Sequence, residues 1–225
     1  MISEMFAHGF IQRAFIGGVL VSLCAALLGV SLVLKRYSMI GDGLSHVSFG
    51  ALSIAIAFGF APIKFSIPIV IIAAFFLLRL AENGKMKSDA AIAMVSASSL
   101  AIGVIVTSLT TGLSTDVCSY MFGSILAMSK DDVIFSVALS VVVLIMFGFC
   151  YHRIFAVTFD ESFSKATGVK VGMYNTLISI FTAVTVVLGI KMMGAMLISS
   201  LIIFPALTSM RVFKSFLSVT ICSAI

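Results

Sequence analysis

Long apolar runs, separated by short stretches that hold most of the charged residues, dominate this sequence. A helix that crosses a lipid bilayer needs about 20 mostly apolar residues. Of the 225 residues 61% are hydrophobic and 10% are charged, against about a quarter charged in ordinary globular proteins. We therefore predict an all-α, polytopic transmembrane helical bundle. We count seven spans, at 14–34, 47–63 with an extension through the preceding motif, 65–78, 90–115, 133–151, 171–190 and 192–210.

The remaining segments are not full membrane spans. Residues 215–225 form a run about half as long as a span, so we expect a single transmembrane domain over 1–225 whose C-terminal span is incomplete. Pro62 is expected to turn the chain between the second and third spans. Residues 117–129 are too short to cross and are predicted to be re-entrant or to lie at the surface.

The basic residues predict orientation rather than nucleic-acid binding. The net charge is +5, but the lysines and arginines are scattered instead of forming a stripe. They concentrate in alternate loops, and cytoplasmic loops carry the excess of Lys and Arg in membrane proteins. We therefore predict an extracytoplasmic amino terminus. The loops assigned to the cytoplasm contain Lys35, Arg36, Arg79, Lys85, Lys87, Arg153, Lys165, Lys170, Arg211 and Lys214.

The four cysteines show no metal-binding or redox spacing. Cys24, Cys118, Cys150 and Cys222 form no CxxC pair, and most lie in apolar stretches, which favours small hydrophobic packing. The first apolar run is too long for the core of a cleavable signal peptide, so we expect none.

One acid and one histidine interrupt the second apolar run. Asp42 and His46 stand four residues apart in "SMIGDGLSHVSFG", and on a helix this spacing places both on one face. A carboxylate and a neutral imidazole suit a divalent transition metal, and an ionisable residue inside a span is a functional candidate. The alternative, left open by the residues alone, is that Asp42 pairs with Lys35 or Arg36 and that His46 bonds a neighbouring helix.

The longest polar stretch, 152–170, predicts a short helix outside the membrane. Thr158 and Glu161 fit a capping box, Asp160 and Glu161 favour a helix start, and Gly168 suits the position after a helix end. We predict a helix over about 159–167, with Phe159, Phe163 and Ala166 on one face. That face either rests on the membrane surface or docks in a groove of a partner.

Other motifs add little or are missing. Pro205 is expected to kink the seventh span. The sequence contains no G-x-x-x-x-G-K-[ST] motif for binding nucleotide phosphates, no HExxH and no GxSxG. We therefore expect this chain not to be an enzyme and any ATP hydrolysis to take place on another subunit.

Five segments in order resemble the permease subunits of the manganese, zinc and iron ABC transporters, the ABC-3 family. They are "FIQRAFIGGVLVSLCAALLGVSLVLKRYSMIGDGLSHVSFGALSIA", "SDAAIAMVSASSLAIGVI", "SYMFGSILAMSKDD", "TFDESFSKATGVKV" and "MMGAMLISSLIIFPALTSM". Many members have proline four residues after the motif histidine, where this chain has Gly50. The C-terminal end is also shorter than is usual in the family.

The resemblance implies roles for particular residues. Asp42 and His46 match the metal-contacting pair of the permeation path. The segment with Phe159, Asp160, Glu161, Phe163 and Gly168 matches the helix that couples to the ATPase. Pro205 falls in a span that matches the family's proline-containing one. The implied fold is the one shared with vitamin B12 and siderophore importers.

The resemblance also implies partners and a location. It predicts a homodimer that works with separate ABC ATPase subunits and an extracytoplasmic metal-binding protein. The chain itself is expected to be a multi-pass protein of a prokaryotic cell membrane, namely the inner membrane in cells that have two membranes. Membrane lipid surrounds the spans, and no permanently bound cofactor is expected, since the divalent metal is the transported substrate.

The leading hypothesis is inward transport of manganese, zinc or iron by alternating access. Because a ligating histidine must be neutral, uptake should weaken below the usual pKa of histidine, about 6.5. The alternatives are import of a metal chelate or another small solute, an intramembrane metal-dependent enzyme, and a proton-driven carrier that works alone.

Overall fold

The computed structural model describes residues 9–82, 88–110, 123 and 130–225. These residues form α-helices and connecting turns, and seven of the helices are long and apolar enough to cross a membrane. The predicted helical bundle is therefore confirmed. The membrane-length helices are α2 (Gly9–Leu34), α3 (Ser38–Ala57), α4 (Pro62–Glu82), α5 (Ser88–Leu109), α7 (Lys130–Phe159), α9 (Val171–Met193) and α10 (Ala195–Val212), and two short ones are α8 (Glu161–Ala166) and α11 (Phe216–Ala224).

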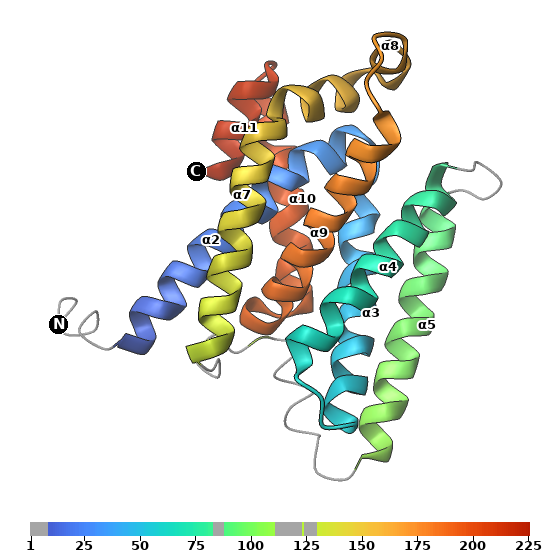
Figure 1. Cartoon of the computed structure of the whole chain (residues 1–225), viewed down its shortest axis with the longest axis vertical. Helices are drawn as coiled ribbons and strands as arrows, with labels where there is room; N and C mark the ends of the chain where they lie inside the picture. The colour runs from blue at the N-terminus through green and yellow to red at the C-terminus, as the bar shows by residue number, and fades with distance from the viewer. Residues whose placement is uncertain (1–8, 83–87, 111–122, 124–129) are drawn as a thin grey trace.

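The helices run alternately up and down (Figure 1), so the ends of different helices meet at the same end of the molecule. α8, the α10–α11 turn and the α2–α3 turn lie at one end, and the first described turn of α2 lies towards the other. α9 is the most enclosed helix together with α3, since 72% of the span in each is buried. These two helices therefore form the centre of the bundle.

Close helix contacts explain several glycines in the spans. A Cβ atom added at Gly29 of α2 would lie 1.8 Å from the carbonyl oxygen of Ile202 on α10, and one added at Gly50 of α3 would lie 2.8 Å from that of Ser99 on α5. Small residues let helix backbones approach closely, which is the usual way that helices pack within membranes. Gly50 thus leaves room for the backbone of α5.

Several predicted boundaries were wrong. The second span is α3, which begins at Ser38, so the predicted extension through the Asp42–His46 motif is confirmed, but the helix ends at Ala57 and not at Ile63. Gly59, with φ +71°, accepts the left-handed conformation at the end of α3, where the amide of Phe60 donates to the carbonyl of Ala55. Pro62 begins α4, as a proline can at the first position of a helix.

The predicted capping box was also wrong. Thr158 does not cap a helix: it is buried within α7, which continues to Phe159. The cap of α8 is Asp160, whose carboxylate accepts a hydrogen bond of 2.9 Å from the amide of Phe163. The physical reason lies in the aromatic packing of the last turns of α7, where the rings of Phe155 and Phe159 lie 5.0 and 6.1 Å from that of Phe216 on α11.

Two prolines lie inside membrane-length helices. α10 continues through Pro205, and α4 contains a second internal proline, Pro68, that the sequence analysis did not weigh. The kink at Pro205 stays a prediction. Residues 117–129, predicted to be re-entrant or at the surface, lie outside the described residues except for Gly123, and so does Cys118.

Candidate functional site

Asp42 and His46 lie one turn apart on α3. The Nε2 atom of His46 is 3.8 Å from Oδ2 of Asp42, and the two side chains are 29% and 41% exposed. A continuous helix with i, i+4 spacing dictates this juxtaposition, so the structure brings the predicted pair together.

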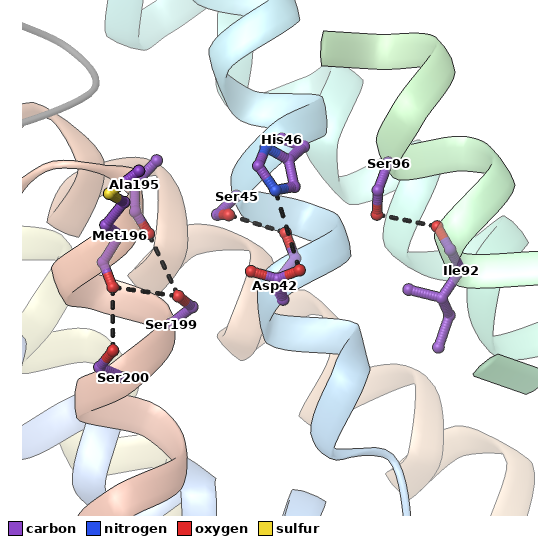
Figure 2. Close-up of polar contacts among 9 residues, drawn as sticks. All are labelled: Asp42, Ser45, His46, Ile92, Ser96, Ala195, Met196, Ser199 and Ser200. Carbon is purple, nitrogen blue, oxygen red and sulfur yellow. Dashed lines mark hydrogen bonds and ion pairs between the residues drawn. The ribbon is translucent and has the colours of Figure 1, made fainter.

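The pair lines a pocket of about 260 Å³ between three helices. α3 contributes one wall with Asp42 and His46, and Leu100 belongs to α5. The opposite wall is the first two turns of α10, with Met196 and Ser199. Figure 2 shows the carboxylate and the imidazole of α3 between these two neighbouring helices. An ion in this pocket would therefore contact groups from separate helices.

The hydroxyls near the pair are occupied by backbone carbonyls. Ser45 donates to the carbonyl of Asp42 at 2.7 Å, and Ser199 donates to those of Ala195 and Met196 at 3.3 and 3.1 Å (Figure 2). A hydroxyl oxygen keeps acceptor capacity after donating its hydrogen. Ser199 therefore still offers an oxygen lone pair to the pocket that Asp42 and His46 also line.

Close packing fixes α3 in place around the pair. A Cβ at Gly43 would lie 2.6 Å from a methyl group of Ile92 on α5, and one at Gly41 would lie 3.3 Å from Ile202 on α10. The glycines therefore allow close approach of α5 and α10, and α3 is not broken at them.

The pair is a sparse ligand set within one chain. In the ranges that the structure describes, no group of three or more His, Cys, Asp or Glu side chains is placed to hold a metal ion. A tight structural zinc site has four ligands. Two side chains with neighbouring hydroxyl oxygens would bind a divalent ion loosely enough to release it.

The second predicted site is the segment around α8. Gly168 has φ +83°, and the amide of Val169 donates to the carbonyl of Ser164, so the predicted glycine at the helix end is confirmed. Phe163 is 64% exposed on α8. Phe159 is 60% exposed but belongs to the end of α7, so these two rings do not share the single helix face that was predicted.

Glu161 is half-buried at the start of α8 and bonds two residues from other parts of the bundle. Its Oε1 atom accepts hydrogen bonds from Nζ of Lys35 at 2.7 Å and from the amide nitrogen of Asn175 at 3.1 Å. Partial burial alone would raise the pKa of the Glu161 carboxyl. The hydrogen bonds from Lys35 and Asn175, with the charges of Lys35 and Lys165, outweigh burial and hold that pKa below its ordinary value of 4.5.

Sequence reasoning did not place four residues that the structure brings to these sites. Lys35 was interpreted as an orientation signal and as a possible partner of Asp42, whereas it bonds Glu161, and Asn175 was not singled out. A lysine directly after an apolar span, together with an amide near the start of another, was the available signal. The lining of the pocket by Met196 and Ser199 had no local signal, because it depends on how α10 packs.

Known proteins resemble this chain over most of its length. It is 32% identical to the high-affinity zinc uptake system membrane protein ZnuB of Buchnera aphidicola, over 87% of this chain and 75% of that protein. It is 27% identical to the manganese import system permease protein ScaB of Streptococcus gordonii, over 96% of this chain and 77% of that protein.

A solved structure has the same fold. PsaBC from Streptococcus pneumoniae, determined in complex with a Fab, superposes on this chain with a TM-score of 0.85 at 27% identity, covering all of this chain and 82% of the other. The sequence model of the ABC 3 transport family matches residues 7–225. The chain therefore belongs to the ABC 3 transport family.

Proposed function

We propose that this chain is the membrane permease subunit through which an ABC importer moves manganese or zinc into the cell. Family membership and the relatives named for manganese and zinc transport support the substrate class. The observation that carries the proposal is the Asp42–His46 pair, which lines a pocket between α3, α5 and α10.

The chemistry of the pair fits transient coordination. A carboxylate oxygen and an imidazole nitrogen accept Mn²⁺, Zn²⁺ or Fe²⁺. Because the pair supplies half of the four ligands of a tight zinc site, an ion can enter and leave. A half-exposed carboxylate is costly against lipid, so we propose that Asp42 faces a path enclosed by a second copy of this chain.

Energy would come from a separate ATPase that docks at α8. The exposed Phe163 ring on this short helix is suited to a partner's groove, and Asp160 and Gly168 fix the two ends of the helix. ATP binding would move α8, and the spans would rearrange around the metal by alternating access. The end with α8 is assigned to the cytoplasm, so the amino terminus and the delivery protein lie outside.

Metal uptake by the reconstituted complex tests the site. We expect Asp42→Ala and His46→Ala to lower uptake of both Mn²⁺ and Zn²⁺ at least roughly tenfold, while the ATPase subunit still co-purifies. Asp131→Ala and His152→Ala remove the same residue types on α7, outside the pocket, and should leave uptake unchanged. Wild-type uptake in a variant that lacks both Asp42 and His46 would refute the site.

The choice of metal and the docking of α8 need separate measurements. Parallel uptake of Mn²⁺, Zn²⁺ and Fe²⁺ by the same preparation identifies the preferred ion. Phe163→Glu should abolish co-purification of the ATPase because it places a charge in an apolar contact. A variant that kept the ATPase bound and active would contradict docking through this ring.

A further inference from the structure

Lys35, Glu161 and Asn175 form a closed polar network beneath α8. Nζ of Lys35 donates to Oε1 of Glu161 at 2.7 Å and to Oδ1 of Asn175 at 2.5 Å, and the amide nitrogen of Asn175 donates to the same Oε1 at 3.1 Å. The three residues come from the end of α2, the start of α8 and the second turn of α9. Each residue therefore contacts the other two, across three helices.

Burial of Lys35 and Asn175 restricts how the hydrogen bonds of this network can be arranged. The Lys35 side chain is 5% exposed and Asn175 is 3% exposed, while the Glu161 side chain that bonds both is 40% exposed. A buried ammonium group is costly unless it is paired and hydrogen-bonded, and loss of one partner leaves an uncompensated charge. Only one orientation of the Asn175 amide directs its oxygen to the lysine and its nitrogen to the glutamate. α8 is thus held in one position against α2 and α9.

The opposite side of α8 carries the ring proposed to meet the ATPase. Glu161 and Ser164 are three residues apart and lie on the inner face, where Ser164 is fully buried. Phe163 is exposed on the outside. A force on Phe163 would therefore reach α2 and α9 through the inner face of the same short helix.

Both helices held by the network lead to the candidate metal pocket. A tight turn follows Lys35. In this turn Arg36 has φ +60°, and the amide of Tyr37 donates to the carbonyl of Leu32 at 2.8 Å. α3, which carries Asp42, begins directly after the turn. Asn175 lies on α9, which ends at Gly194, and α10 with Ser199 follows directly. The two routes end on opposite walls of the pocket.

We infer that Lys35 and Asn175 are positioning residues which, through Glu161, link movement of α8 to both walls of the metal pocket. This inference rests on the proposed function, because it assumes that α8 meets the ATPase. It also reassigns Glu161: the hydrogen bonds that its carboxylate accepts hold α8 to the bundle.

The test compares metal moved per ATP hydrolysed by the full complex in proteoliposomes, with ⁵⁴Mn²⁺ or ⁶⁵Zn²⁺ as substrate. We expect Lys35→Met and Glu161→Gln each to lower this ratio roughly tenfold while ATP hydrolysis continues, which is the size of a typical coupling between sites. The double variant should lose no more than the worse single one, because the residues act as a unit. Lys214→Met removes an exposed lysine at the same end and should leave the ratio unchanged.

Asn175→Ala leaves the Lys35–Glu161 pair in place, so it keeps the test informative if the other variants fail to fold. It should lower the ratio by roughly fivefold. A merely structural role would lower the yield of folded protein and leave the ratio at its wild-type value. Wild-type ratios in Lys35→Met and Asn175→Ala, or multiplied losses in the double variant, would overturn the link. Failure of the wild-type complex to move metal would instead refute the proposed function.

Discussion

The contact between Gly29 and Ile202 gives a sharp test of the packing that places α10. A Cβ at Gly29 would lie 1.8 Å from the carbonyl oxygen of Ile202, 2.9 Å from its carbonyl carbon and 3.4 Å from its Cα. These are backbone atoms, so no side-chain rotation can relieve the overlap. In Gly29→Ala, α2 and α10 must therefore move apart. α10 is also the helix that carries Met196 and Ser199.

The magnitude follows from two opposing effects. Overpacking in a well-packed interior costs about 1–3 kcal/mol, and a backbone overlap of this depth belongs at the upper end. Alanine is about 1 kcal/mol more favourable than glycine inside a helix. We therefore expect Gly29→Ala to lower the free energy of unfolding by about 2 kcal/mol, which corresponds to a fall in melting temperature of roughly 4–8 °C for a chain of this size.

Thermal unfolding of the detergent-solubilised protein measures this effect. Gly148→Ala on α7 is the matched control, because a Cβ there would meet no atom within 4 Å. It gains the helix preference without the overlap and should melt roughly 2–4 °C higher than wild type. If Gly29→Ala melted at or above the temperature of the Gly148→Ala protein, the close approach of α2 and α10 would be wrong.

Three further predictions concern the α8 segment and the cysteines. Gly168→Ala should destabilise the end of α8 by about 1 kcal/mol, since φ is +83° while no atom lies within 4 Å, and faster amide exchange in α8 would detect it. The lowered pKa of Glu161 means that its contribution to stability is present above pH 4.5 and is lost as the pH falls through the still lower folded value. Melting temperatures of wild type and Glu161→Gln should therefore converge in acid, and a constant difference would refute the shift. We would compare two variants that each keep a single cysteine. Buried Cys24 should react with a maleimide far more slowly than Cys222 of α11, which lines a surface pocket. Equal reaction rates would contradict the packing of α2.

Local patterns were sufficient to predict the helical spans. Runs of apolar residues fix where a helix can cross a bilayer, because every backbone polar group there must be paired within the helix. Gly168 was recognised for the same kind of reason, since the left-handed residue after a helix end is a local requirement. The start of α8 was wrong because α7, whose last turns carry the aromatic contacts of Phe155 and Phe159 with Phe216, continues about two turns beyond the predicted end of its span at residue 151.

The two candidate sites divide in the same way. The spacing of Asp42 and His46 predicted that they share a face of one helix, and α3 places them so. That α5 and α10 close a pocket around them, with Ser199 opposite, depended on the contacts of Gly43 and Gly41 with residues far away in the chain. No pattern within a single helix contains this information.

The sequence by itself determined how many helices can span the membrane, which residues end α8, and that an acid and an imidazole stand one helical turn apart. Each of these depends on neighbours within a few residues. Only the tertiary structure decided that Glu161 turns inward to Lys35 and Asn175, which are 126 and 14 residues from it in the chain. The physical reason is that a buried charge takes its partner from whichever helix packs beside it, and helix packing is set by the whole bundle.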